Sequence, residues 1–295
     1  MAEAKQSFGG KWTAEKLQRL RKYLHAYVQI MKRQTWCEYC YIDAFAGTGY
    51  NTPKDTEASE DSFAELLPEV ASSETQAFLG SSVRLALETM PAFMRYVFIE
   101  KDQAKAAELA KLKADYPSLA DRIEPRAGDA NAEIQQICST WNWRNRRAVL
   151  FLYPFGMQVT WDTIRAVAET NAIDMWLLFP AGIGVNRMLP KHGDIPEAWK
   201  RRLDAFLGVP ESVWRPEFYK EESESDLFGI SSSTQKVATI KSIGRYFNER
   251  LKTVFEHVAP NPLELCNDSG TSLYLLCFAA KNATAVKIAN DVLRP

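Results

Sequence analysis

Three acidic residues follow short apolar runs, and a glycine turn follows the first of them. Asp43 comes after "YCYI", Glu100 after "YVFI", and Asp129 lies in "AGDAN" beyond a third run. Carboxylates accept hydrogen bonds from amino groups and hydroxyls. Gly47 and Gly49 let the backbone approach a ligand closely, because glycine has no Cβ. This combination is typical of a site for a nucleotide-like cofactor.

The residues around the glycine turn favour a cofactor without phosphates. After Gly49 the chain runs "YNTP", so the helix-opening pattern GxGxxG of dinucleotide-binding folds is absent. Asp43 would repel a pyrophosphate but would accept hydrogen bonds from an amino group. S-adenosylmethionine has no phosphate and carries a cationic aminoacyl end. It therefore fits the pattern better than a nicotinamide dinucleotide, which is the less favoured alternative.

Each acid has a predicted role. Asp43 is expected to face the aminoacyl end, Glu100 to accept from both ribose hydroxyls, and Asp129 to accept from the adenine amine. Taken singly, Glu100 or Asp129 would also suit a helix cap or a solvated loop. The residues that we expect to line the cofactor are Asp43, Phe45, Ala46, Gly47, Gly49, Glu100, Lys101, Asp129 and Ala130.

The elements that must position these residues alternate between strand and helix. Strands are predicted within 39–46, 95–102, 121–131, 147–156 and 172–180, and helices within 79–90, 103–116, 132–140, 160–170 and 234–258. Because the strands are nearly continuous apolar runs, they indicate a parallel sheet covered on both faces. Two apolar runs around "NDSG" in 262–282 predict an antiparallel hairpin. The predicted fold is α/β, with a doubly wound, mostly parallel sheet and an antiparallel C-terminal hairpin.

The stretch "DAFAGTG" resembles the acid-x-F-x-G-x-G motif of class I, Rossmann-like S-adenosylmethionine-dependent methyltransferases, as found in cytosine DNA methyltransferases and some ribosomal RNA methyltransferases. More narrowly, the chain resembles the bacterial three-Cys-motif partner (TcmP) family. The matching stretches, in order over roughly residues 15 to 180, are "YLHAY", "YIDAFAGTG", "GSSVRLAL", "FIEKD", "GDAN", "YPFG" and "TWDTI".

This resemblance implies methyl transfer from S-adenosylmethionine to an unidentified acceptor, with a nucleic acid as one candidate. It also implies a three-cysteine-motif protein as a candidate partner. A non-catalytic subunit that keeps the cofactor fold within a larger bacterial system is the alternative. The predicted parts are an N-terminal helical segment in 1–36 and a methyltransferase-like domain in 37–295. Insertions are expected at about 51–77 and 181–230, and the acidic run "EESESD" in the second is expected to be a solvated loop.

The chain departs from the family pattern after the fourth strand. The family has "DPxG" there, whereas this chain has "YPFG". The resemblance places Tyr153, Pro154 and Phe155 at the catalytic position, where methyltransferases acting on amino groups often carry an acid or an amide. A tyrosine hydroxyl can hydrogen-bond but titrates near about pH 10, so it supplies no carboxylate at neutral pH. Amine methylation is therefore less favoured, and a structural turn at "YPFG" is the alternative.

Composition and charge argue against other classes. The formal net charge of −1 gives no global case for a nucleic-acid coat or a membrane surface. No apolar run approaches the roughly 20 residues that span a bilayer, and no signal-peptide stretch is visible. The five cysteines indicate reduced thiols and a cytoplasmic location. Cys37 and Cys40 form a lone CxxC without nearby histidines, so we predict buried core cysteines and no metal site.

Two basic stretches are candidates for contact with an anionic substrate. "WNWRNRR" at 141–147 mixes tryptophans with arginines. It precedes the fourth strand, at the edge away from the predicted cofactor site, so a solvated loop is the favoured interpretation. The run Lys200-Arg201-Arg202 lies on the substrate side and is the better candidate.

Overall fold

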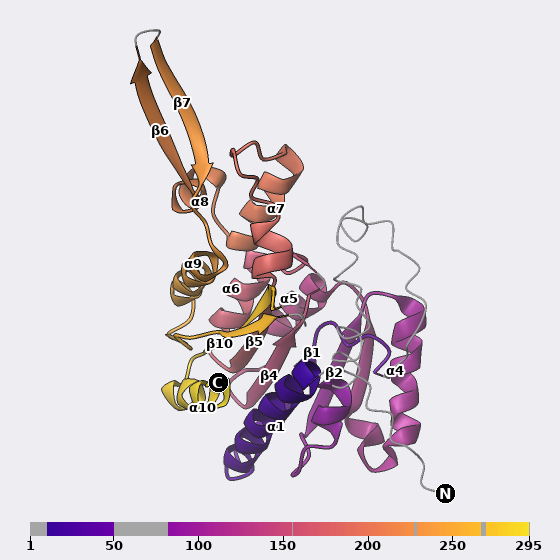
Figure 1. Cartoon of the computed structure of the whole chain (residues 1–295). Coiled ribbons are helices and arrows are strands. Elements are labelled where there is room, and N and C mark those ends of the chain that lie inside the picture. The colour runs from indigo at the N-terminus through magenta and orange to yellow at the C-terminus, as the bar shows by residue number, and fades with distance from the viewer. Residues whose placement is uncertain (1–10, 50–81, 155, 227–228, 267–269, 295) are drawn as a thin grey trace, which may run out of the picture.

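The computed structural model describes residues 11–49, 82–154, 156–226, 229–266 and 270–294 (Figure 1). The predicted insertion at 51–77 and the predicted site residue Phe155 lie outside the described residues.

One mixed sheet forms the centre of the protein. Its strands are β1 (Glu38–Asp43), β2 (Arg95–Glu100), β3 (Ile123–Ala127), β4 (Arg146–Leu152), β5 (Ile173–Phe179), β8 (His257–Val258), β9 (Leu263–Cys266) and β10 (Ser272–Ala280). The strand order is β3-β2-β1-β4-β5-β10-β8, and β9 pairs with β10. Strands β1 to β5 are parallel to one another, whereas β10 is antiparallel to β5, β8 and β9. The predicted fold class is confirmed, including the antiparallel C-terminal hairpin.

Helices cover both faces of the sheet. They are α1 (Lys11–Met31), α4 (Gln103–Asp115), η1 (Pro117–Arg122), α5 (Ala130–Thr140), α6 (Trp161–Glu169), η2 (Ala181–Asn186), α7 (Glu197–Leu207), α8 (Glu211–Phe218), α9 (Ile240–Lys252) and α10 (Ala283–Leu293). A short helix also spans 82–87. These positions agree with the predicted alternation, except that the helix expected at 234–258 begins only at Ile240, where Thr239 forms a capping box.

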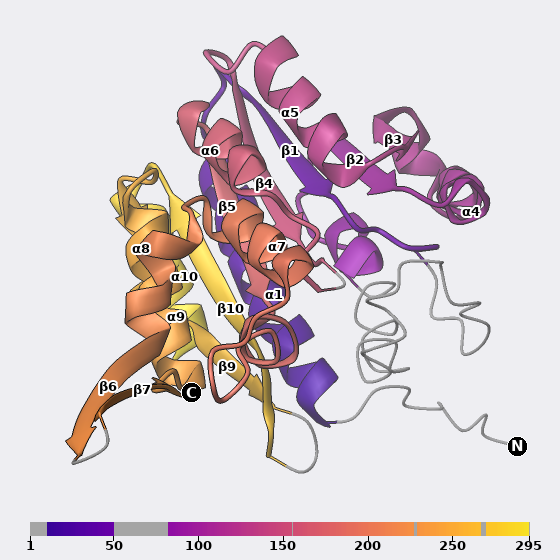
Figure 2. The same cartoon turned by 90° about the horizontal axis from the view of Figure 1, so that it is seen from above.

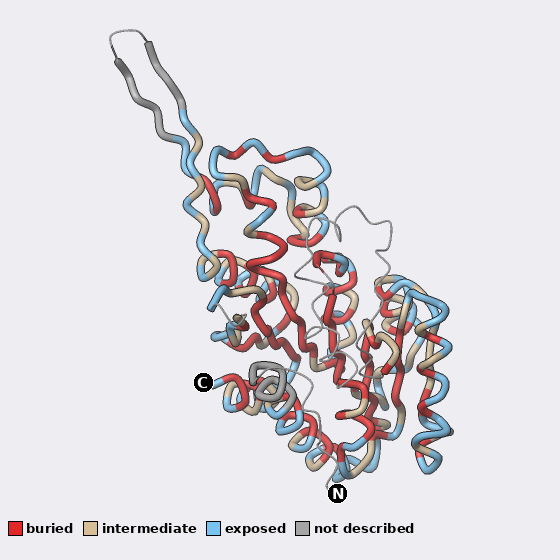
Figure 3. The backbone as a smooth tube through the Cα atoms, turned by 45° about the vertical axis from the view of Figure 1, so that its right-hand side comes forward, coloured by how far each residue is buried: buried red, intermediate tan, exposed pale blue. Residues whose placement is uncertain are grey.

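The strands are continuous apolar runs because the side chains of each strand pack into two hydrophobic cores, one on each face of the sheet. In β1, Tyr39 and Tyr41 pack with α1, α4 and α10 on one face. Cys40 and Ile42 point the other way and pack with α5, α6 and α9. This alternation follows from the two-residue period of a strand. Figure 3 shows that the most buried backbone follows the central strands, whereas the outer turns of the surrounding helices are exposed.

The region predicted as a second insertion contains a two-stranded arm. Strands β6 (Tyr219–Asp226) and β7 (Gly229–Lys236) pair antiparallel and make no sheet contact with the central strands. They extend away from the body of the protein (Figure 1 and Figure 2). The acidic run "EESESD", expected to be a solvated loop, is therefore part of strand β6. That expectation was wrong because β6 lacks the apolar alternation by which a half-buried strand is recognised.

Candidate functional site

The carboxyl ends of the parallel strands bring the predicted acids to one edge of the sheet. Asp43 ends β1, Glu100 ends β2, and Ala127 ends β3 two residues before Asp129. Within the sheet, Asp43 pairs with Phe98 of β2, and Glu100 pairs with Ala127 of β3. The register thus places the three turns next to one another, as the sequence predicted for a cofactor site at this edge.

The glycine turn is tied to the second strand through backbone hydrogen bonds. The Ala46 amide donates to the Ile99 carbonyl at 3.0 Å, and the Gly47 amide donates to Glu100 Oε2 at 3.0 Å. The glycine turn that follows β1 is therefore in direct contact with Glu100, the acid that ends β2. The bond fixes the orientation of the Glu100 carboxylate at the sheet edge.

The two glycines of this turn are required for different reasons. Both have positive φ, +60° at Gly47 and +70° at Gly49, which disfavours residues with a Cβ. A Cβ on Gly49 would lie 3.0 Å from Leu112 Cδ1 and 3.1 Å from Leu109 Cδ2, so packing against α4 also requires glycine there. A Cβ on Gly47 would meet no atom of the described residues within 4 Å. Among these residues, Gly47 therefore borders open space into which a ligand can approach the backbone.

Glu100 keeps capacity for further hydrogen bonds. Its Oε2 accepts from Gly47, and its Oε1 accepts from the Asp102 amide at 3.0 Å. A carboxylate offers about four lone-pair sites, so each oxygen can accept one more donor. Glu100 is half-buried, and the neighbouring Lys101 is exposed. The carboxylate is thus oriented by the protein and still accessible to two hydroxyls.

Asp129 acts as the N-cap of α5. Its Oδ1 accepts from the amides of Asn131 at 3.0 Å and Ala132 at 3.2 Å. The alternative role of a helix cap is therefore what the structure shows. Both bonds use Oδ1, which leaves Oδ2 without a hydrogen bond among the described residues, while the adjacent Ala130 is buried. Capping and acceptance from an amine are compatible in this geometry.

The Asp43 carboxyl group is hydrogen-bonded to other residues in the protein interior. The residue is fully buried, and its Oδ2 accepts from the Ser82 hydroxyl at 2.8 Å and from the Tyr41 hydroxyl at 3.5 Å. Its Oδ1 accepts from the Phe45 amide at 3.2 Å. Burial raises the pKa of Asp43 to about 7, although these three donors act in the opposite direction. Asp43 therefore braces the glycine turn, and its contact with a cofactor stays a prediction.

Tyr153 and Pro154 directly follow the end of β4, and both are buried. The Tyr153 ring lies 6.2 Å from the Phe151 ring and 6.0 Å from the Tyr274 ring, measured between centroids. Tyr274 comes from β10, next to the residue that pairs with Phe179 at the end of β5. Sequence reasoning missed Tyr274 as a neighbour of this site. The strand run "SLYLLCFAAK" could have indicated it only if the pairing with β5 had been known.

The arginines of "WNWRNRR" are engaged in structural contacts. Arg146 donates to Glu38 Oε2 at 2.6 Å, and its guanidinium lies 4.3 Å from the centre of the Trp141 ring. Arg147 lies over the Trp36 ring at 4.6 Å. These contacts are at the amino ends of the parallel strands, opposite to the glycine turn. The segment is thus remote from the candidate site, as predicted.

Part of the second basic stretch is neutralised by acids. The Lys200 ammonium lies 2.8 Å from Glu197 and 3.2 Å from Glu211. Lys200 is therefore a poor candidate for binding an anion by itself, because a ligand would compete with two carboxylates.

The described cysteines and carboxylates form no metal site. Cys37 and Cys40 are buried and free, and burial raises the pKa of each thiol. Within the described ranges, no group of three or more metal-ligating side chains is placed to hold an ion. The described helices also include none with the length and apolar character needed to cross a membrane.

No family model matches the chain, and no curated protein shows significant similarity to it. Solved structures resemble it at low levels. Protein LPL1258 from Legionella pneumophila is 14% identical, covers 94% of this chain and 99% of its own length, and has a TM-score of 0.41. A methyltransferase from Geobacter sulfurreducens is 12% identical, with coverages of 77% and 89% and a TM-score of 0.31. The protein SMU.472, solved in complex with SAH, is 9% identical, with coverages of 80% and 56% and a TM-score of 0.27.

Proposed function

We propose that the protein is a class I methyltransferase that uses S-adenosylmethionine. The observation that carries the proposal is the hydrogen bond from the Gly47 amide to Glu100 Oε2, beside the open space at Gly47. It sets a carboxylate with free lone pairs against a glycine turn at the carboxyl edge of a doubly wound sheet. Such a site suits a ligand with vicinal hydroxyls.

The hydrogen-bond acceptors of the site fit an adenosyl ligand. Glu100 would hold the ribose hydroxyls through its free lone pairs, and Asp129 Oδ2 would accept from the adenine amine. The backbone of Gly47 would border the ligand, because no described residue lies within 4 Å of the position of a Cβ there. When bound, S-adenosylmethionine supplies a methyl group from its sulfonium.

The protein's own contribution to the reaction would come from the end of β4. Tyr153 and Pro154 are buried and would exclude water from the acceptor side. A tyrosine hydroxyl remains neutral at pH 7, so Tyr153 would orient an acceptor by hydrogen bonding without taking its proton. Alignment of the two reacting atoms would then be the main source of catalysis. We therefore propose a methyl acceptor that does not have to be deprotonated by a carboxylate.

The second candidate is a non-catalytic subunit that keeps the cofactor fold. The observation that favours it is Tyr153, which stands where the TcmP pattern has an acid and which packs between aromatic rings. In this case the chain would be a TcmP-like member of a bacterial assembly that includes a three-cysteine-motif protein.

Calorimetry with S-adenosylmethionine, S-adenosylhomocysteine and NAD tests the proposal. We expect both sulfur ligands to bind and NAD to bind far more weakly. Glu100→Gln should weaken binding at least about tenfold, because the amide loses charge-assisted acceptance from the ribose hydroxyls. Glu108→Gln is the matched control, since Glu108 lies on the outer surface of α4 and its one ion pair among the described residues is with Lys111. Absence of binding by both sulfur ligands at millimolar concentration would overturn the proposal. Binding without transfer of a methyl label to nucleic acid, protein or cell extract would favour the non-catalytic candidate.

A further inference from the structure

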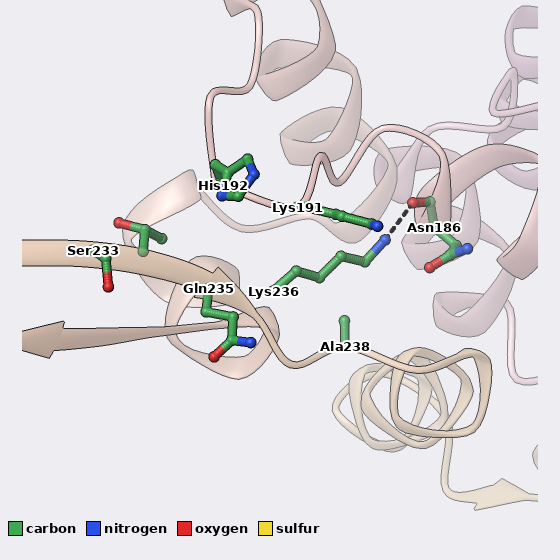
Figure 4. Close-up of a pocket in the computed structure, with 8 residues that line it drawn as sticks. Asn186, Lys191, His192, Ser233, Gln235, Lys236 and Ala238 are labelled. Carbon is green, nitrogen blue, oxygen red and sulfur yellow. Dashed lines mark hydrogen bonds between the residues drawn. The ribbon is translucent and has the colours of Figure 1, made fainter.

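A pocket of about 650 Å³ lies between the chain that follows β5 and the base of the arm. It is lined by Asn186, Lys191, His192, Ser233, Thr234, Gln235, Lys236 and Ala238 (Figure 4). Asn186 ends η2, which begins two residues after β5, so the pocket is on the same edge of the sheet as the glycine turn. Its volume is within the range of about 300–1,000 Å³ that is usual for ligand sites.

The charged side chains in the described lining of this pocket are all basic. They are two lysines and a histidine, and the described lining includes no aspartate or glutamate. Lys236 Nζ donates to the carbonyl oxygens of Asn186 at 2.7 Å and Leu189 at 2.8 Å. In the part of the chain that the structure describes, no carboxylate lies within ion-pair distance of Lys191 or Lys236. The remaining lining groups are mostly hydroxyls and amides, which can donate to an oxyanion.

The two lysines are arranged differently. Carbonyl oxygens fix the Lys236 ammonium in place, and partial burial lowers its pKa. The exposed Lys191 side chain extends toward Asn186, as the Lys236 side chain does (Figure 4). A fixed cation and an adjustable one that approach the same place form an arrangement suited to an anion.

Positive charge continues beyond the pocket onto α9. The chain passes from Ala238 through the cap Thr239 into this helix, where Lys241 and Arg245 are exposed. Residues four apart lie on the same helix face, about 5–6 Å from each other. Neither side chain has an ion pair among the described residues, and further along α9 Lys252 pairs with Glu249. The cations without an ion pair among the described residues therefore extend over a larger surface than a single phosphate group would contact.

We infer that this pocket binds a backbone phosphate of a nucleic-acid strand, and that the strand continues over Lys241 and Arg245. The inference rests on the proposed function, because it assigns the acceptor class to the same edge of the sheet. A free phosphate or a mononucleotide would occupy the pocket but would not reach both cations of α9. Among the described residues the arm lines the pocket through β7, where Thr234 pairs with Glu221 of β6 across the ladder.

The test measures binding of a fluorescent oligonucleotide of about 12 nucleotides, as DNA and as RNA, to the full chain at two salt concentrations. Lys191→Glu and Lys241→Glu are the test variants. Neither side chain makes a hydrogen bond or an ion pair among the described residues, so folding should be preserved, and thermal unfolding checks this. Lys287→Glu is the matched control, because Lys287 is exposed on α10 at the opposite face of the sheet.

Each test variant should weaken oligonucleotide binding about tenfold at low salt and lower the slope of log affinity against log salt by about one. The control variant should bind as the unmodified protein does. Equal affinity of Lys191→Glu and Lys287→Glu would overturn the inference, and so would a lack of oligonucleotide binding by the unmodified protein. Binding of inorganic phosphate alone, lost in Lys191→Glu, would replace the nucleic acid with a small anion. Calorimetry with S-adenosylmethionine should be unchanged in all variants, so failure of the cofactor proposal would be seen separately.

Discussion

The Ser82 hydroxyl donates a 2.8 Å hydrogen bond to Asp43 Oδ2 and thereby joins the start of the helix at 82–87 to the end of β1. The two residues are distant in sequence and both fully buried. This bond makes the acid that introduces the glycine turn part of the interior. The stability of the turn should therefore depend on the protonation state of one carboxyl group.

Asp43 should make the free energy of unfolding fall as the pH rises toward neutrality. Its pKa is raised to about 7 in the folded protein, whereas an unfolded aspartate titrates near about 4. Between these values the folded state binds more protons at this site, so the contribution of Asp43 to stability is greatest below about pH 4 and falls by up to a few kcal/mol by pH 7. Asp43→Asn should abolish the decline between about pH 6 and pH 7. Urea unfolding at half-unit pH steps measures this, and an unchanged decline would contradict it.

Tyr23→Phe should destabilise the protein more at alkaline than at acid pH. The Tyr23 hydroxyl donates to Asp174 Oδ2 at 2.7 Å, and burial raises the pKa of Asp174 to about 6. At pH 8 the variant would leave an ionised, half-buried carboxylate without this donor, at a cost of about 2 kcal/mol, and at pH 5 about 1 kcal/mol. Tyr27→Phe is the control, because the buried Tyr27 hydroxyl has no hydrogen-bond partner in the described part of the chain. Similar losses in both variants at pH 8 would refute the role of the pair.

Alanine at the two turn glycines should separate stability from ligand binding. Gly49→Ala combines an unfavourable φ with contacts of 3.0 and 3.1 Å to α4, so it should cost about 2–4 kcal/mol. Gly47→Ala should cost only about 1–2 kcal/mol from φ alone. Its methyl group would project into the open space, so it should weaken S-adenosylmethionine binding more than its stability cost suggests. Chemical unfolding and calorimetry on both variants test this, and normal cofactor affinity in Gly47→Ala would contradict it.

Tyr274→Phe should stabilise the protein. The Tyr274 hydroxyl is buried without a hydrogen-bond partner among the described residues, and burial raises its pKa. Removing an unsatisfied buried hydroxyl should raise the free energy of unfolding by about 1 kcal/mol. Urea unfolding compares this variant with Tyr23→Phe, which removes a hydroxyl that has a partner. A loss of stability in Tyr274→Phe would contradict this prediction.

The parts of the fold that depend on local pattern were predictable. The ends of β1 and β2 at Asp43 and Glu100 follow from apolar runs that stop at an acid. The hairpin of β9 and β10 follows from two apolar runs around a polar turn. In each case the signal is contained in a short window, because burial on both faces demands continuous apolar sequence.

The features that were not predictable depend on distant partners. Nothing near Asp43 in the sequence indicates that Ser82 will donate to it, or that the carboxyl group will be buried deeply enough to raise its pKa. Tyr274 reaches Tyr153 only because β10 pairs with β5. Strand β6 has a polar sequence whose backbone pairs only with β7, so its structure comes from that pairing and not from a buried face.

The antiparallel β10 also determines when the protein can finish folding during its synthesis. Strand β5 pairs with β4 and β10, but β10 leaves the ribosome only after α7, α8, the arm and α9 have been made. Until then β5 has an open edge that can pair with another chain. Helix α1, which is made before the sheet, packs against α10, which follows β10, and Arg19 donates to the carbonyl oxygen of Val292. A nascent chain should therefore depend on the segment from β10 to α10, and truncation before β10 should favour aggregation over a smaller folded form.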